Sequence, residues 1–374
     1  MKITCTKENL SKALSIVGGI ANKNVNLPIL GNVLIKADDQ KTELVSTNLE
    51  LAIIVHIRSK VDKPGSFTVP SRTLSEFVNL LSDEKVEMEL KDNELVITCG
   101  RSSTKIKGTT AEEFPVIPSV SNGSGFLFLA QDMKSGLSQT ISSLAKSEIR
   151  PELSGMYFGF NTAYYKGLIL AATDSYRLAE KKIKIQQGEK EFKIIVPGRT
   201  AQEIVHILSL AESEEKEKNV RVLVGENQIA LHYGNVQMVS RLVEGNYPDY
   251  AQIIPKEFKT VATFEVEKIT KEIKMASLFA AVGVNAISCI IDNKEGLIKL
   301  SSTSSQTGEY SSEIQSEVEG GENSIMLNYR YVLDGLNNIR SEMALLKVVN
   351  AESPCLFVPK NDETFLYIVM PIRQ

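Results

Sequence analysis

Three arginines recur at equivalent places in repeated segments of the chain, and this pattern could bind an anion. The segments read VPSRTLSEFVNLL over 69–81, VPGRTAQEIVHIL over 196–208 and, more divergently, LNYRYVLDGL over 327–336. Their shared arginines are Arg72, Arg199 and Arg330. Each is predicted at the start of a helix, where the helix dipole disfavours a positive side chain. The repeated placement favours a surface that faces something anionic; the alternative is an internal pair with Glu76 or Glu203.

Lysines on other predicted helices fit the same surface. They belong to the first helix of each repeat, and they are Lys7, Lys12, Lys134, Lys268, Lys271 and Lys274. Solvated lysines are common on helices, so an ordinary exposed face explains them as well.

Catalytic or metal-binding chemistry has little support in the sequence. The three histidines, His56, His206 and His232, are far apart and form no HExxH pattern, and no phosphate-binding loop is present. Asp174 follows an apolar run, as a catalytic carboxylate could, but its counterpart in the first repeat is Asn48. Asn and Asp after a strand are typical of turns. The residues therefore show no catalytic constellation, and pairs of carboxylates from distant segments stay open as an alternative.

The cysteines and the N-terminal residues suggest a reducing compartment. Four cysteines (Cys5, Cys99, Cys289 and Cys355) form no CxxC pair. The first nine residues lack the charged and apolar regions of a secretory signal, and no apolar run reaches membrane-spanning length. We expect reduced thiols and a cytoplasmic location.

The elements that carry these residues repeat with the period of a whole domain. Pro70 and Pro197 are 127 residues apart, and Asn328 follows 131 residues later. This period predicts three α+β repeats over 1–121, 122–254 and 255–374, each with two helices and six or more strands.

Two local patterns define the helices of each repeat. The first helices carry apolar pairs at i, i+4 spacing, which are Leu10/Leu14, Met133/Leu137 and Ile269/Ile273. The second helices are predicted to start with capping boxes, Thr73 with Glu76 and Thr200 with Glu203. In the third repeat Tyr331 and Asp334 occupy these places, so the box is degraded there.

The charge is distributed unevenly over the repeats. Residues 1–121 and 122–254 each carry 15 basic and 15 acidic side chains, whereas 255–374 carry 12 basic and 16 acidic. The net charge of −4 therefore comes from the third repeat. A protein that grips nucleic acid by bulk charge is usually basic, and this chain is not.

Over essentially its full length the chain resembles the bacterial DNA polymerase III β subunits, the replicative sliding clamps. The resemblance is carried by 27–32 (LPILGN), 69–72 (VPSR), 114–115 (FP), 172–179 (ATDSYRLA), 247–250 (YPDY) and 369–373 (VMPIR). It implies a homodimer whose two chains close head to tail into a ring of six similar domains, with helices lining the hole and sheet outside. Duplex DNA would pass through the ring without sequence-specific contacts. The clamp would tether the polymerase and have no catalysis, no metal and no cofactor of its own.

The resemblance also implies three sets of site residues. The DNA-facing residues are Lys7, Lys12, Arg72, Lys134, Arg199, Lys268, Lys271 and Arg330. The groove residues, between the second and third domains, are Leu153, Thr173, Ser175, Tyr176, Arg177, Leu178, Pro248, Ile253, Ile368, Met370, Pro371 and Arg373. The joint residues, where two chains meet, are Arg101, Lys105, Lys107, Leu278, Phe279, Glu309 and Glu313.

The expected partners follow from these sets. They are duplex DNA, a second copy of the chain, and the peptides of the polymerase III catalytic subunit, the clamp loader and other replication and repair proteins. Two residues depart from the family: Tyr176 stands where histidine is frequent, and Gln374 where an apolar residue is frequent. Without the resemblance, the groove residues also fit packing between domains, and the joint residues fit unrelated surface charges.

Two other classes of protein remain as alternatives. A nucleic-acid-processing enzyme would need clustered carboxylates for metal ions, and a pure protein-binding scaffold would not bind DNA.

Overall fold

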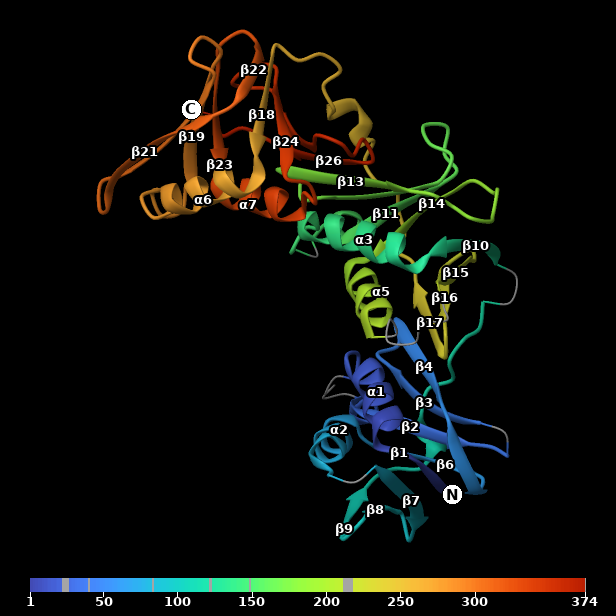
Figure 1. Cartoon of the computed structure of the whole chain (residues 1–374). Helices are drawn as coiled ribbons and strands as arrows, with labels where there is room; N and C mark the ends of the chain where they lie inside the picture. The colour runs from blue at the N-terminus through green and yellow to red at the C-terminus, as the bar shows by residue number, and fades with distance from the viewer. Residues whose placement is uncertain are drawn as a thin grey trace. The chain divides into compact units, whose positions relative to one another are not determined.

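The computed structural model describes residues 1–21, 27–39, 41–82, 84–120, 123–147, 149–210 and 218–373 (Figure 1). The chain divides into two compact units. Unit 1 contains Met1–Lys134, Ile185–Glu189 and Arg199–Leu242, and unit 2 contains Ser135–Lys184, Lys190–Gly198 and Val243–Gln374. Among the described residues, no helix has the length and apolar character needed to span a bilayer.

Unit 1 contains two antiparallel sheets. The five-stranded sheet has the order β5-β1-β7-β8-β9, with bounds β1 (Lys2–Thr6), β5 (Ser59–Lys63), β7 (Lys85–Lys91), β8 (Glu94–Cys99) and β9 (Ser102–Lys107). The eight-stranded sheet has the order β10-β15-β16-β17-β4-β3-β2-β6. Its strands are β2 (Asn32–Ala37), β3 (Thr42–Thr47), β4 (Leu51–Ile57), β6 (Gly65–Pro70), β10 (Ser124–Leu129), β15 (Asn219–Val224), β16 (Gln228–Tyr233) and β17 (Val236–Arg241).

The helical segments of unit 1 are α1 (Lys7–Gly18), α2 (Ser71–Leu80) and the 3-10 turns η1 (Pro28–Gly31) and η2 (Ala111–Glu113). Two further helices, α3 (Ala130–Thr140) and α5 (Gly198–Leu210), have residues in both units. The predicted apolar pairs are confirmed, because Leu10, Leu14, Met133 and Leu137 are all buried.

Unit 2 also contains two antiparallel sheets. The nine-stranded sheet has the order β14-β11-β12-β13-β26-β25-β24-β18-β22. Its strands are β11 (Gly155–Phe160), β12 (Leu168–Thr173), β13 (Arg177–Ile183), β14 (Phe192–Pro197), β18 (Thr260–Glu265), β22 (Glu317–Gly320), β24 (Met343–Val348), β25 (Cys355–Pro359) and β26 (Phe365–Val369). The four-stranded sheet has the order β21-β20-β19-β23, with bounds β19 (Ala286–Asp292), β20 (Leu297–Ser304), β21 (Gly308–Gln315) and β23 (Asn323–Asn328).

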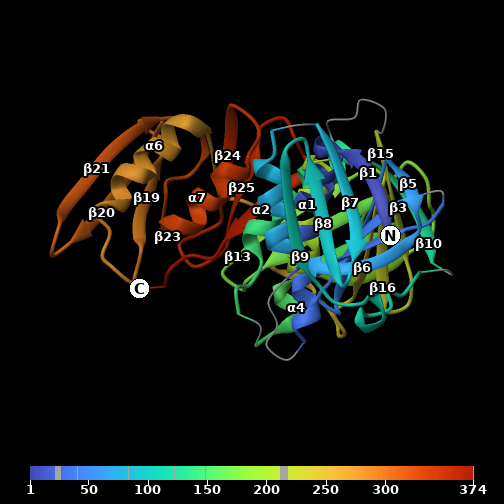
Figure 2. The ribbon, with the colours of Figure 1, turned by 90° about the horizontal axis from the view of Figure 1, so that it is seen from below.

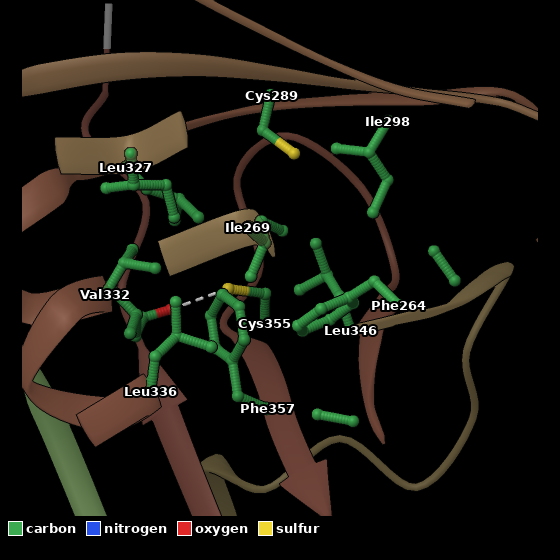
Figure 3. Close-up of a cluster of buried hydrophobic side chains, with 14 of the residues drawn as sticks. Phe264, Ile269, Cys289, Ile298, Leu327, Val332, Leu336, Leu346, Cys355 and Phe357 are labelled. Atoms are coloured by element: carbon green, nitrogen blue, oxygen red, sulfur yellow. Dashed lines mark hydrogen bonds between the residues drawn. The ribbon is translucent and has the colours of Figure 1, made fainter. Parts of the chain in front are cut away.

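The helical segments of unit 2 are α4 (Pro151–Ser154), α6 (Val266–Ser277), α7 (Tyr329–Asn338) and the 3-10 turns η3 (Ile141–Ser143) and η5 (Tyr250–Ile253). Helix α6 packs on β20 and β21 and on its neighbour α7 (Figure 2). Figure 3 shows the core below them, where Phe264, Ile269, Leu336 and Phe357 meet from four different elements. The predicted pair Ile269/Ile273 is buried in this core, so the apolar face of α6 is confirmed.

The two capping boxes predicted from Thr73 and Thr200 are wrong. Helix α2 begins at Ser71, and its N-cap is Pro70, whose side chain makes no capping hydrogen bond. Helix α5 begins at Gly198. Both threonines are therefore the third residue of their helix and lie inside its first turn, where they cannot act as the N-cap.

Hydrogen bonds of another kind occur at the starts of α5 and α7. Thr200 Oγ1 hydrogen bonds to Ser240 Oγ at 2.7 Å and so ties α5 to β17. The third copy of the motif, whose box is degraded, has a different cap: Asn328 Oδ1 accepts the N–H of Arg330 at 3.0 Å.

Both large sheets join strands from neighbouring repeats. In unit 1 the last strand of the second repeat, β17, pairs with β4 of the first, with Ser240 opposite Leu51. In unit 2 the last strand of the third repeat, β26, pairs with β13 of the second, with Val369 opposite Arg177. The corresponding strands β9 and β21 remain at sheet edges. β9 is the last strand of the first repeat, as β17 and β26 are of the second and third. β21 follows β20 in the third repeat, as β13 follows β12 in the second. Cross-repeat pairing explains why the compact units cut through the second repeat.

Candidate functional site

The turns before β4 and β13 share one pattern of hydrogen bonds. Asn48 Oδ1 accepts the N–H of Leu51 at 2.8 Å, and Asp174 Oδ1 accepts the N–H of Arg177 at 3.0 Å. The preceding threonines match as well, because Thr173 Oγ1 donates to the carbonyl of Arg177 at 2.7 Å, as Thr47 Oγ1 does to that of Leu51 at 3.0 Å. Asp174 is thus a turn residue, as the comparison with Asn48 predicted.

The third repeat matches the first as the sequence indicated. Ser302 Oγ donates to the carbonyl of Ala276 at 2.7 Å, as Ser46 Oγ does to that of Val17 at 2.6 Å. Thr303 is therefore the counterpart of Thr47, and the turn after it is one residue longer, because Thr303 pairs with Glu309 whereas Thr47 pairs with Ala52.

Arg177, the first residue of β13, is buried beside the turn that precedes this strand. Its side chain is only 5% exposed, and its Nε donates to Asp174 Oδ2 at 3.1 Å. Its Nη1 donates to Asp334 Oδ2, and its guanidinium carbon lies 4.8 Å from the ring centroid of Tyr331. Burial opposes the charge, but Tyr367 and the two carboxylates hold the pKa of Arg177 above its ordinary value.

Tyr176 presents a large ring beside this buried arginine. It is 62% exposed, and its ring stacks on that of Tyr331 with 6.3 Å between centroids and 18° between planes. Its carbonyl accepts the N–H of Met370 at 2.8 Å. The backbone of Tyr176 is thus fixed, and its ring forms part of the surface.

Segment 247–254 lies against the same part of β13. Tyr250 donates its hydroxyl to Glu180 Oε2 at 2.6 Å, and its ring packs edge-on against Tyr247. Tyr250 also packs on an apolar cluster that contains Leu178 and Ile368. The structure therefore brings together three segments that the sequence prediction grouped: 173–178, 247–254 and 368–370.

The twelve predicted groove residues differ in exposure. Those with exposed side chains are Ser175, Tyr176, Pro248, Ile253 and Arg373, and those with half-buried side chains are Met370 and Pro371. The buried ones are Leu153, Thr173, Arg177, Leu178 and Ile368. Leu178 and Ile368 face each other across the β13–β26 ladder and are fully buried, so they lie under the surface and not on it.

The last residues of the chain connect to a different sheet. The N–H of Ile372 donates to the carbonyl of Met326 at 2.8 Å, which attaches the segment to β23. Arg373 lines a cavity of about 350 Å³ together with Ser288, Glu352 and others. Gln374, noted as a departure from the family, lies outside the described residues.

The residues predicted to face DNA make varied local contacts. Arg72 pairs with Glu76 at 2.7 Å, as the internal-pair alternative predicted for it. Arg199 instead donates to the carbonyl of Gly19 at 3.1 Å, and Arg330 stands 5.9 Å from the ring centroid of Tyr329.

The lysines of this set also have different surroundings. Lys7 donates to the carbonyl of Leu81, and Lys268 pairs with Glu265 at 2.6 Å. Lys271 is exposed, and Lys12 and Lys134 are half-buried.

Five of the seven joint residues lie on or next to the two edge strands described above, and the other two follow α6. Lys105 and Lys107 are exposed on β9, Arg101 is in the turn before it, and Glu309 and Glu313 are exposed on β21. Leu278, at the end of α6, is 69% exposed. Its neighbour Phe279 stacks on Tyr310 of β21 with 6.0 Å between ring centroids.

Sequence reasoning missed three residues near Arg177 and Tyr250, in the predicted groove. Asp334 and Tyr331 were read only as a lost capping box, and Glu180 was not considered. Asp334 pairs with a residue 157 positions away, and no local pattern reveals such a pair. A weaker signal was available, since a buried arginine must find carboxylates. Among the described residues, no three His, Cys, Asp or Glu side chains gather in a way that could hold a metal ion.

Comparison with known proteins covers the whole chain. Three family models match: the DNA polymerase III beta subunit N-terminal domain over residues 1–118, its central domain over 129–249 and its C-terminal domain over 251–373. A beta sliding clamp from Staphylococcus epidermidis is 26% identical, covering 100% of this chain and 99% of the relative.

Solved structures agree in fold. The DNA polymerase sliding clamp from Bacillus subtilis has a TM-score of 0.93 and 27% identity, covering 100% of this chain and 99% of that one. A sliding clamp from Pseudomonas aeruginosa, bound to griselimycin, has a TM-score of 0.93 and 26% identity, covering 100% of both chains.

Proposed function

Because the chain belongs to the DNA polymerase III beta subunit family, we propose that it acts as a sliding clamp. Two copies close into a ring around duplex DNA, and the ring tethers the replicative polymerase. The match of all three domains of this family, in order, is the observation that carries the proposal.

The weak, varied contacts of the DNA-facing residues suit a sliding ring. A ring holds DNA by topology, so its phosphate contacts need only be weak and interchangeable, and they carry no base readout. Exposed cations such as Lys271 and Arg330 supply such contacts, while the pairing of Arg72 with Glu76 weakens its hold on phosphate. The net charge of −4 also limits bulk attraction to DNA.

The proposed ring closes by a third copy of the junction that occurs twice within the chain. β17 pairs with β4 and β26 with β13, so a β9 edge from one copy pairs with a β21 edge from another. A joint between unlike surfaces closes into a ring when the rotation permits. Two joints then complete the dimer.

The internal junctions also predict the register of the joint. Leu51 and Arg177 come one residue before Ala52 and Leu178, the partners of Thr47 and Thr173. Gly308 likewise comes one residue before Glu309, the partner of Thr303. On the other strand, Ser102 starts β9 after a two-residue turn, as Val236 starts β17. Ile106 is therefore the counterpart of Ser240, which lies opposite Leu51. By analogy, Ile106 of one copy lies opposite Gly308 of the other.

This register places opposite charges against each other. Counting outward from Ile106 and Gly308, Lys105 lies opposite Glu309 and Arg101 opposite Glu313. Directly opposed charges of unlike sign stabilise a strand pair and select its register. Lys107 lies opposite an uncharged residue, Thr307, and contributes less. Glu309 and Glu313 on this side of the joint account for two of the four excess acidic residues of the third repeat.

The groove residues form the proposed docking site for partner peptides. Tyr176, Pro248 and Ile253 supply exposed apolar surface, and Arg177, Thr173 and Leu178 support it from below. The partners we propose are the polymerase III catalytic subunit, the clamp loader and other replication and repair proteins. No catalysis is proposed for the chain itself, its proposed location is the cytoplasm, and its proposed domains are 1–121, 122–254 and 255–374.

Topology gives the decisive test. The protein is loaded by a clamp loader onto nicked circular DNA, and the DNA is then cut once. We expect retention on the circle and release on linearisation, with ends blocked by bulky protein adducts restoring retention. Equal retention on open linear DNA would mean ordinary binding, and no loading at all would favour a protein scaffold that does not bind DNA.

A further inference from the structure

The guanidinium of Arg177 is held by two repeats of the chain, and one of its carboxylate partners has no assigned role. Asp174 belongs to the same turn as Arg177, whereas Asp334 lies on α7 in the third repeat. Asp174 also accepts the N–H of Tyr176 at 3.0 Å through its other oxygen, so it shapes the turn. Asp334 contacts Arg177 from a different repeat and does not belong to the turn. A buried charge that loses one carboxylate is poorly compensated, and its side chain shifts to find another partner.

Helix α7 brings an aromatic ring to the same turn. Tyr331 precedes Asp334 by three residues, and residues at this spacing share one face of a helix. The ring of Tyr331 stacks on Tyr176 and also lies 4.8 Å from the Arg177 guanidinium carbon. Asp334 and Tyr331 therefore contact the two adjacent residues of the turn from one helix face.

The position of α7 does not depend on Asp334. A Cβ added at Gly335 would stand 2.3 Å from the ring of Tyr367, so the helix lies directly against β26. The hydroxyl of Tyr367 donates to the carbonyl of Tyr331 at 2.9 Å, and Val332 and Leu336 are buried in the core of the third repeat. Removing the charge of Asp334 should leave this packing in place and act on Arg177.

We propose that Asp334 is a positioning residue for the groove. By binding Arg177, it fixes the turn so that the stacked rings of Tyr176 and Tyr331 present one orientation to a partner peptide. The proposal rests on the proposed function, because it assumes that the groove binds peptides. It adds a residue outside the predicted groove set and gives the buried Arg177 a specific task.

The test compares Asp334→Asn with a matched change elsewhere in unit 2. The probe is a fluorescein-labelled peptide with the clamp-binding segment of the polymerase III catalytic subunit from the same genome, and anisotropy gives its Kd for the full chain. We expect Asp334→Asn to weaken binding roughly tenfold, the scale of one charge-assisted hydrogen bond, and Asp334→Glu to restore most of it. The control is Asp362→Asn, which removes the 2.6 Å pair with Lys181 and should leave the Kd unchanged.

A double-mutant comparison separates positioning from general stability. In a Tyr176→Ala background, Asp334→Asn should have little further effect on the peptide Kd, because the ring that it positions is gone. An equal loss in both backgrounds, an unchanged Kd in Asp334→Asn alone, or loss of the folded dimer in that variant would each overturn the proposal. If the unaltered chain does not bind the peptide, the groove function fails, and the positioning role fails with it.

Discussion

Reversing the charge of Lys105 should weaken the dimer, and the register of the proposed joint sets the size of the effect. Lys105 is exposed on β9 and would lie opposite Glu309 of the other copy. An exposed cross-strand pair of opposite charges contributes about 0.5 kcal/mol, and a like-charge pair costs about as much. Lys105→Glu therefore changes each joint by about 1 kcal/mol. The ring has two joints, so the dimer Kd rises roughly 30-fold.

The assay is sedimentation equilibrium over a dilution series at low and high salt. The combined variant Lys105→Glu with Glu309→Lys should dimerise like the unaltered chain, because each joint again has opposite charges. Lys107→Glu, opposite Thr307, should have a smaller effect, and high salt should reduce the difference between the variants. The control is Lys63→Glu, exposed on β5 at the other edge of the same sheet. An unchanged Kd in Lys105→Glu, or no recovery in the combined variant, would refute the register.

Three further predictions concern the folded chain. Gly335→Ala forces a Cβ to within 2.3 Å of the Tyr367 ring and should lower the free energy of unfolding by about 1–3 kcal/mol in urea titration; Gly321→Ala, with open space around it, is the control, and equal stability of the two would contradict the close packing. Phe264→Ala removes a fully buried ring of the core in Figure 3 and should cost about 3–5 kcal/mol, against less than about 0.5 kcal/mol for the exposed Leu80→Ala; a small loss at Phe264 would count against that core. Burial raises the pKa of the Cys5 and Cys289 thiols to about 12, so the folded state favours the neutral thiols. Their contribution to stability should be complete below about pH 9 and decline as pH rises towards 12, and Ellman's reagent at pH 8 should label these thiols only after unfolding; rapid labelling of the native chain would show that they are accessible.

Local patterns predicted the elements well where a short stretch of sequence decides the structure. The apolar pairs of α1, α3 and α6 are buried because i, i+4 spacing alone defines one helix face. Asn48 and Asp174 were correctly assigned to turns, because their side chains accept N–H groups only two and three residues away. The capping boxes failed because the sequence does not show where the preceding strand ends. β6 runs to Pro70, and α2 starts at once.

Long-range contacts were beyond sequence reasoning. Repetition predicted three similar units, but it could not show that β17 and β26 each pair with a strand of the preceding repeat. The ion pair of Arg177 with Asp334 depends on that pairing, because α7 packs on β26, and β26 lies beside β13. The groove positions came from the family resemblance. Their unequal burial follows from their place in the fold: the buried ones lie in α4, β12, β13 and β26, and the exposed ones lie in the turn before β13, in segment 247–254 and in the last residues of the chain.

A crystal structure of the oligomer tests the central claim most directly. The account predicts a closed ring of two chains in which β9 of each pairs with β21 of the other, with Lys105 opposite Glu309 and Arg101 opposite Glu313. A ring joined through other strands, a shifted register or a chain that crystallises with both edges unpaired would contradict it.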